Sequence, residues 1–192
     1  MSIGSIDDLF ISDAATALYS SWQSLPRDED NICPKRFDIN FGEIPGGHKK
    51  HSFLLTNLGE GVLSASDIRD EITNFVGQRL DGQNLTERYG LNQMRYEAPY
   101  CEAVFGQPYT GVLTRRTINR SGTYADFVSC HMPLLDYRNE VRYLLGLASI
   151  TNIEEPKKVS TPLILDNSQV ISRVWIDIGA GTPELDGSNP VA

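Results

Sequence analysis

Residues 109–150, YTGVLTRRTINRSGTYADFVSCHMPLLDYRNEVRYLLGLASI, are the stretch of sequence that decides the fold. They contain three runs rich in β-branched and aromatic residues, separated by two short polar breaks that are typical of hairpin turns. The stretch therefore predicts three consecutive antiparallel strands. The runs are Tyr109–Asn119, Tyr124–Leu134 and Arg142–Ile150.

Upstream of this stretch, residues 51–57 and 62–65 predict two further strands around a Gly-Glu-Gly turn. Residues 66–78 and 92–105 predict helices, and Pro99 predicts that the second is either kinked or starts late. No strand alternates with a helix in the βαβ manner, so we expect an α+β fold with a five-stranded antiparallel sheet and helices on one face. A flanking N-terminal helix over residues 5–25 completes the expected architecture, because its apolar residues recur at three- and four-residue steps.

The chain divides into three parts. Residues 1–30 form the expected N-terminal amphipathic helix and an acidic loop, and residues 31–150 form the core domain. Residues 151–192 begin as a polar linker and continue as a C-terminal tail. The tail contains one β-like run at 170–178.

The 192 residues carry a formal charge of −8, which is unevenly distributed. Residues 1–30 hold one basic and six acidic groups, residues 31–150 hold 13 of each, and residues 151–192 hold three basic and six acidic groups. A neutral centre between acidic ends argues against nucleic-acid binding, which depends on Lys and Arg. There is no run of about 20 apolar residues and no secretory signal, so we expect a cytoplasmic protein with no membrane insertion.

The sequence offers no recognisable catalytic or metal-binding motif. Cys130 adjoins His131, but neighbours on a strand point to opposite faces, and a zinc site needs about four converging ligands. Nucleophile-elbow, dinucleotide and phosphate-loop motifs are missing. We therefore predict no metal site, no catalytic residue and no enzymatic activity. Arg115, Arg116 and Arg120 are expected on a solvated strand face and hairpin end.

Three local patterns resemble the PAS superfamily, and specifically the single-domain PAS-like family of alphaproteobacteria. Together they cover about residues 20–150. They are Trp22 followed by Pro34-x-Arg36-x-Asp38-Ile39 and Ile44; Asn74-Phe75-Val76-Gly77-Gln78-x-Leu80-x-Gly82-x-x-Leu85; and Met132-Pro133-Leu134 followed by Val141 and Leu144-Leu145-Gly146.

The resemblance implies a ligand cavity between the sheet and the helices. No position matches the residues by which such proteins hold haem, flavin or another chromophore, so the cofactor stays unknown. A filled core without a ligand is the alternative. The residues expected to line a cavity are Ile72, Phe75, Tyr96, Tyr100, Val128, Cys130, Met132, Tyr143 and Leu145.

Apolar elements in the two acidic ends predict a contact with a second chain, because neither is polar enough to lie in water alone. We expect a homodimer, as similar PAS modules often form, or contact with a signalling partner protein. The candidate residues for this surface are Phe10, Ala14, Leu18, Trp22 and Trp175.

The expected function is a sensory or protein-interaction module in bacterial signal transduction, with or without a small ligand. Two alternatives stay open: a small enzyme of unknown type that uses the same cavity, and a ligand-free structural adaptor. Clustered groups with strongly shifted pKa values in a deep pocket would favour the enzyme.

Overall fold

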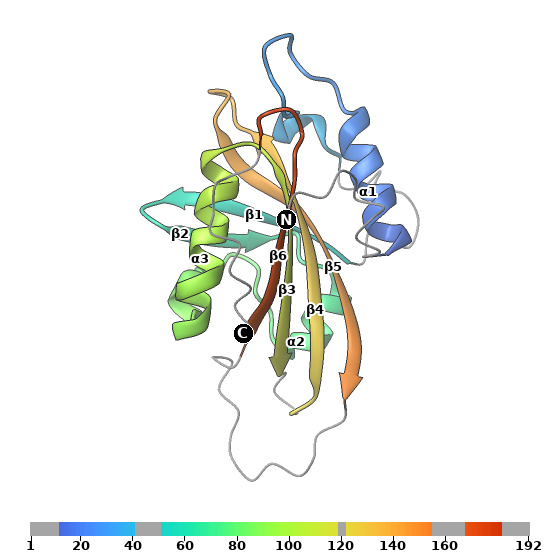
Figure 1. Cartoon of the computed structure of the whole chain (residues 1–192), viewed down its shortest axis with the longest axis vertical. Helices are drawn as coiled ribbons and strands as arrows, with labels where there is room; N and C mark the ends of the chain where they lie inside the picture. The colour runs from blue at the N-terminus through green and yellow to red at the C-terminus, as the bar shows by residue number, and fades with distance from the viewer. Residues whose placement is uncertain (1–11, 41–50, 119–121, 155–167, 182–192) are drawn as a thin grey trace.

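The computed structural model describes residues 12–40, 51–118, 122–154 and 168–181. In this part of the chain the fold is α+β, with one antiparallel sheet and three α-helices (Figure 1). The helices are α1 (Asp13–Ser24), α2 (Asp70–Val76) and α3 (Leu91–Gly106). The strands are β1 (Ser52–Gly59), β2 (Val62–Ser66), β3 (Thr110–Ile118), β4 (Tyr124–Leu135), β5 (Val141–Glu154) and β6 (Gln169–Ile176).

The sheet has six strands in the order β2-β1-β5-β4-β3-β6, so the prediction of five strands was wrong. The additional strand is β6, which was expected only as a β-like run in the tail. It pairs antiparallel with β3, with Gly111 opposite Trp175 and Leu113 opposite Arg173. β3 would otherwise end the sheet with unpaired backbone groups, and β6 satisfies them while burying Trp175.

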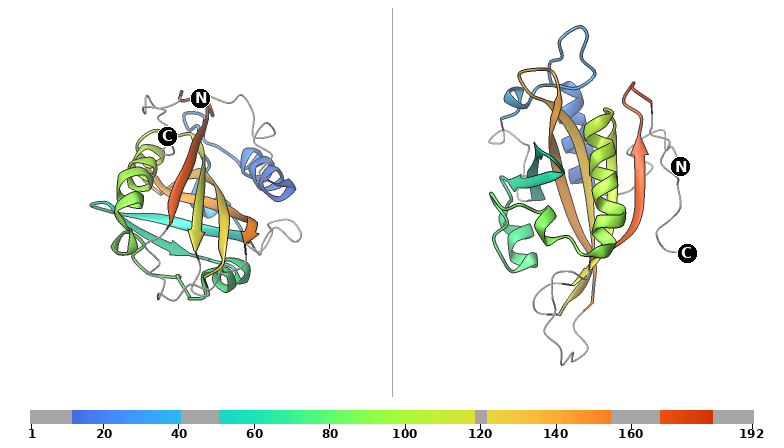
Figure 2. Two further views of the ribbon diagram at one scale, coloured as in Figure 1. Left: turned by 60° about the horizontal axis from the view of Figure 1, so that its bottom comes forward. Right: turned by 90° about the vertical axis from the view of Figure 1, so that its left-hand side faces the viewer.

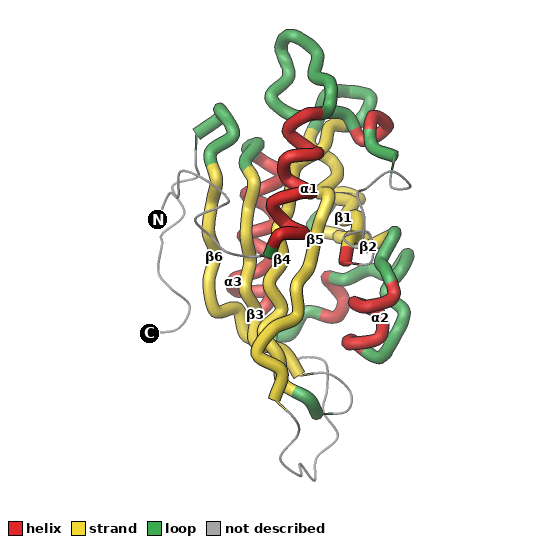
Figure 3. Tube along the Cα trace, turned by 90° about the vertical axis from the view of Figure 1, so that its right-hand side faces the viewer, coloured by secondary structure: helices red, strands yellow, loops and turns green. Residues whose placement is uncertain are grey.

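Helices cover both faces of the sheet (Figures 2 and 3). α1 lies across one face, and α3 lies across the other together with α2. We call these the α1 face and the cavity face. Residues alternate between the two faces along each strand, so Cys130 and Met132 of β4 lie on the α1 face, whereas His131 lies on the cavity face.

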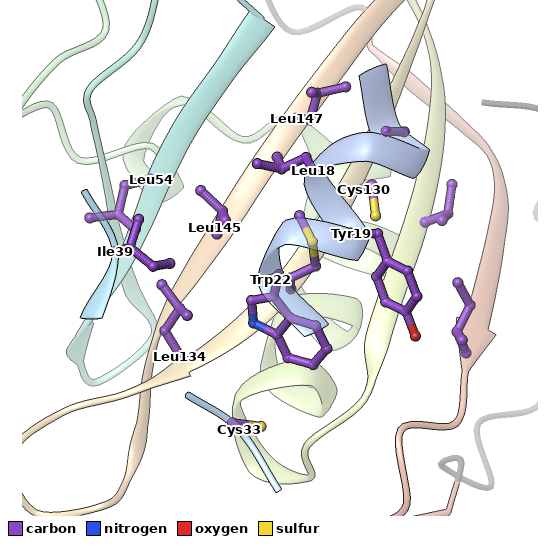
Figure 4. Close-up of a cluster of buried hydrophobic side chains, with 14 of the residues drawn as sticks. Leu18, Tyr19, Trp22, Cys33, Ile39, Leu54, Cys130, Leu134, Leu145 and Leu147 are labelled. Atoms are coloured by element: carbon purple, nitrogen blue, oxygen red, sulfur yellow. The ribbon is translucent and has the colours of Figure 1, made fainter. Parts of the chain in front are cut away.

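α1 begins after Ser12, whose Oγ accepts a hydrogen bond from the Ala15 amide at 3.2 Å. Its buried stripe packs on the chain's own sheet (Figure 4), and Trp22 Nε1 donates a hydrogen bond to the Pro133 carbonyl at 3.0 Å. The stripe consists of Ala15, Leu18, Tyr19 and Trp22.

α3 begins at Leu91 and continues through Pro99, so the prediction of a late start was wrong. Its inward stripe follows the helical spacing and includes one charged residue. The buried residues are Glu97, Tyr100, Cys101 and Val104. α2 ends before Gly77, which adopts a left-handed conformation with φ 73°. It begins at Asp70 and not at residue 66 as predicted, because Ser66 is the last residue of β2.

The packing of α1 predicts a large effect for Trp22→Ala. Removing the indole leaves a cavity and an unpaired carbonyl, so the free energy of unfolding should fall by about 3–5 kcal/mol, measured by urea denaturation. Phe37→Ala is the control, because Phe37 is 70% exposed. Comparable losses in both variants would contradict the packing described here.

Candidate functional site

A cavity of about 190 Å³ lies on the cavity face, between the sheet, α2, α3 and the segment 78–89 that joins the two helices. Its walls are mostly apolar. Backbone hydrogen bonds from Gly82 N to Ala65 O (2.7 Å) and from Leu85 N to Leu63 O (2.8 Å) tie the joining segment to β2. The apolar lining consists of Phe53, Leu55, Ala65, Ile68, Ile72, Phe75, Val76, Leu80, Leu85, Ile118 and Phe127.

His131 lies on the sheet side of this cavity between two glycines. Its register partners are Gly111 of β3 and Gly146 of β5. A Cβ atom at Gly111 would overlap the Tyr100 hydroxyl, and one at Gly146 would overlap the Phe53 ring. Because both positions are glycine, these two rings pack edge-on against the imidazole, with centroids 5.4 and 5.7 Å from it. His131 is fully buried as a result.

The environment fixes the protonation of His131. Burial first, and then the positive charge of Arg115, lowers the pKa of His131 to about 3, so the ring is neutral at pH 7. Burial also holds the pKa of Tyr100 well above its usual value, so its hydroxyl keeps its proton. That hydroxyl lies 2.7 Å from His131 Nδ1. The Tyr100 hydroxyl hydrogen finds an acceptor only when the hydroxyl donates to Nδ1, and in that arrangement the neutral ring carries its hydrogen on Nε2.

Nε2 of His131 is the ring nitrogen that does not take part in the hydrogen bond with Tyr100. It is buried and has no hydrogen-bond partner among the described residues. A buried donor without an acceptor is costly, so such groups in native proteins are usually matched by water or a ligand. His131 lines the cavity, and its Nε2–H is therefore a candidate ligand contact.

A buried ion pair joins α3 to β3 at the edge of the cavity. Arg115 donates from Nε to Glu97 Oε2 at 2.8 Å and from Nη2 to Glu97 Oε1 at 2.7 Å. Its Nη1 donates to Ser129 Oγ at 3.2 Å, and the Tyr89 hydroxyl donates to Glu97 Oε1 at 3.2 Å. Burial alone would lower the pKa of Arg115, but the charge and hydrogen bonds of Glu97 outweigh burial and raise it.

Arg88 and Ser168 add polar atoms to the lining. Arg88 Nη2 donates to Gln78 Oε1 at 3.3 Å, whereas its Nη1 is buried without a hydrogen-bond partner in the described part of the chain. No ion pair within the described ranges involves Arg88. Ser168 Oγ is also buried and has no partner there. The polar lining consists of Gln78, Arg88, Tyr89, Gln93, Glu97, Arg115, Thr117, His131 and Ser168.

Of the residues predicted to line a cavity, the structure places only Ile72 and Phe75 on its wall. Tyr100 lies behind the wall, where it holds His131, and Tyr96 packs against the same cluster. The other five lie on the α1 face, so their predicted place was wrong. Strand alternation groups these residues as expected, but the helix that covers them is α1. They are Val128, Cys130, Met132, Tyr143 and Leu145.

The described residues that were predicted to form a partner surface pack against other residues of the same chain. Leu18 and Trp22 are buried under α1, and Ala14 packs against the same cluster. Trp175 is buried on the cavity face, stacked on Tyr100 with ring centroids 4.9 Å apart. These four residues are therefore not a free surface, which corrects the prediction. Phe10 lies outside the described residues.

Sequence reasoning missed the polar half of the site. Arg115 was expected in solvent with Arg116, yet its side chain is only 13% exposed, because strand alternation turns it to the cavity face, where it pairs with Glu97 of α3. Arg116 instead forms ion pairs with Asp126 and Glu154. Two adjacent arginines within an otherwise uncharged strand were the available signal. Arg120 lies outside the described residues.

Three further features concern the described residues, 12–40, 51–118, 122–154 and 168–181. Within these ranges no group of three or more His, Cys, Asp or Glu side chains could hold a metal ion, and no helix is long and apolar enough to cross a bilayer. The three cysteines are free and buried. Burial raises the pKa of the Cys33 thiol and of the Cys130 thiol to about 12, so both stay protonated at pH 7.

Comparison with protein-family models, curated proteins and solved structures finds no match to this chain. The site therefore has to be interpreted from its own geometry: a small apolar cavity whose polar side holds one neutral histidine, one buried ion pair and one arginine without a counter-charge.

Glu97→Gln tests the buried ion pair. The substitution keeps the shape of the side chain and leaves Arg115 charged, buried and without its counter-ion. We expect the free energy of unfolding to fall by roughly 3–5 kcal/mol in urea at pH 7. Glu154→Gln is the matched control, because Glu154 is 64% exposed in its pair with Arg116 and should contribute little. Equal losses of unfolding free energy in both variants would show that burial of the Glu97–Arg115 pair does not determine its contribution to stability.

The neutral state of His131 predicts a dependence of stability on pH. The unfolded chain binds a proton at the ordinary histidine pKa of 6.5, whereas the folded chain binds it only near pH 3. The contribution of His131 is therefore complete above pH 6.5 and declines as the pH falls. The slope should approach about 1.4 kcal/mol per pH unit.

Urea denaturation between about pH 7 and pH 5 measures this slope. His131→Phe keeps a ring in place and removes the titrating group, so the part of the slope that is due to His131 should disappear. If the wild type and the variant had the same slope over this range, the burial of a neutral His131 would be refuted.

Proposed function

We propose that this chain is a non-enzymatic, PAS-like sensory or protein-interaction module of bacterial signalling. It responds to a small molecule held in the cavity and passes the response on through contacts with a second copy or another protein. The observation that carries the proposal is the cavity of about 190 Å³ on the helix-covered face of the sheet. Binding sites for small molecules are concave, mostly apolar and lined by a few polar groups, and this cavity has the same composition.

The position and lining of the cavity support this proposal. It lies between an antiparallel sheet and the helices on one face, the arrangement that the resemblance to PAS domains implies. Much of the wall comes from the stretch that carries the second resembling pattern, which contributes Phe75, Val76, Gln78, Leu80 and Leu85. A structural adaptor with a filled core would not need this space.

A small enzyme using the same cavity is the second candidate, because ionisable groups with shifted pKa values cluster there. The directions of these shifts favour binding over catalysis. The pKa of His131 is far below 7, and the pKa values of Tyr100 and Arg115 are raised away from 7. Groups of this kind hold one protonation state at neutral pH, whereas general acids and bases work best when their pKa lies near the working pH.

The proposed partner contacts and location follow from the same observations. Because the stripe of α1 is buried on its own sheet, a homodimer would form through another surface. We place the protein in the cytoplasm. The three cysteines support this location, because they are free and no two of them form a disulfide.

Binding of toluene to the purified full chain tests the proposal. Toluene suits the apolar wall and needs no polar contact, so we expect it to raise the unfolding temperature and to slow hydrogen exchange around the cavity. A sensor also transmits occupancy, so exchange in α1 or β6, outside the cavity wall, should change as well.

Ala65→Leu supplies the specificity test, because Ala65 lines the cavity and a larger side chain there fills it. The variant should lose the response to toluene, whereas Gln23→Leu, on an exposed position of α1, should retain it. Unchanged stability and exchange in the wild type would overturn the proposal. Changes confined to the cavity wall would refute the sensory part and leave a simple binding protein.

A further inference from the structure

The lining of the cavity carries an unbalanced charge. Among the described residues it contains two arginines, Arg88 and Arg115, and one carboxylate, Glu97, while His131 is neutral. Arg115 and Glu97 neutralise each other through two hydrogen bonds. The remaining charge is the guanidinium of Arg88, so the lining has a net charge of one positive unit.

The unpaired polar atoms of the lining can all donate hydrogen bonds. Arg88 Nη1, His131 Nε2 and Ser168 Oγ are buried without a partner among the described residues. Arg88 Nη1 is a hydrogen-bond donor and cannot accept. His131 Nε2 is a donor when Tyr100 donates to Nδ1, and the Ser168 hydroxyl can donate its hydrogen. A ligand that pairs with these atoms as donors offers acceptor atoms, and the oxygens of a carboxylate are such acceptors.

The volume restricts the body of the ligand. An apolar protein cavity of about 150 Å³ accommodates benzene, and drug-sized pockets begin near 300 Å³. A cavity of about 190 Å³ therefore suits a single ring or a short branched chain with a small polar head.

We propose that the cavity binds a small monocarboxylic acid with an aromatic or branched apolar body. The apolar body contacts the side chains of Ile72, Phe75 and their neighbours, Arg88 balances the carboxylate charge, and His131 Nε2–H donates to a carboxylate oxygen. The inference rests on the proposed function, since it names the ligand class of the same cavity.

A carboxylate fits better than the other charged groups that could enter. A cation would add to the positive charge of the lining and would meet no free acceptor. A phosphate dianion would leave an excess negative charge in an apolar enclosure, which is unfavourable. A neutral amide or ester would leave the Arg88 charge unmatched.

Three probes of similar size and different charge test this inference: benzoate, benzamide and benzylamine, measured with the full chain by calorimetry and thermal unfolding at pH 7. Charge-assisted hydrogen bonds contribute more than neutral ones. We therefore expect benzoate to bind roughly tenfold tighter than benzamide, and benzylamine to bind most weakly.

Two variants, each of which removes one positive charge, test whether the preference for benzoate depends on Arg88. Arg88→Gln should abolish the preference for benzoate and leave benzamide binding within about twofold, which also shows that the cavity is intact. Arg79→Gln is the matched control, because Arg79 is 83% exposed and does not line the cavity. It should bind all three probes as the wild type does.

The remaining outcomes separate this inference from the proposed function. Three outcomes would overturn the inference of a monocarboxylate ligand and leave the cavity as a binding site. They are equal binding of benzoate and benzamide by the wild type, a preference of the wild type for benzylamine, and equal losses of benzoate affinity in Arg79→Gln and Arg88→Gln. If none of the three probes and no toluene bound, both the ligand class and the proposed function would be overturned.

Discussion

The paired charges of Glu97 and Arg115 are the interaction on which the arrangement around the cavity depends. Neither charge could be buried alone, because removing a single ion from water costs several kcal/mol. Together they fix α3 against β3, and through the hydroxyls of Tyr89 and Ser129 they also reach the joining segment and β4. The polar side of the cavity is therefore held in one geometry by residues from four parts of the chain.

The two faces of β4 show how one strand serves two purposes. Cys130 and Met132 belong to the buried apolar cluster under α1. The residues between and beside them, Ser129 and His131, are polar, fully buried and turned toward α3. The glycines beside His131 leave room for aromatic rings in place of side chains on the neighbouring strands. The same alternation thus places an apolar cluster under α1 on one face and the cavity that His131 lines on the other.

The strands β1–β5 and the helices could be predicted from periodicity and turn residues, because these signals are local. The side of the sheet that holds the cavity could not. Alternation shows that Cys130 and Met132 share a face, but not whether α1 or α3 covers it. The burial of Arg115 depends on Glu97, 18 positions away in another element, and no local pattern reports that pairing. The place of β6 likewise depends on which strand edge stays open, which is a property of the whole sheet.

The central claim is that His131 presents an unpaired N–H to a ligand in this cavity. Nitrogen-15 NMR of the histidine rings in the full chain, recorded at pH 7 with and without benzoate, tests it most directly. The account predicts a neutral His131 with hydrogen on Nε2, whose signal moves on addition of benzoate while that of His51 does not. A His131 ring that carries its hydrogen on Nδ1, or whose Nε2 signal ignores benzoate at saturating concentration, would contradict the account.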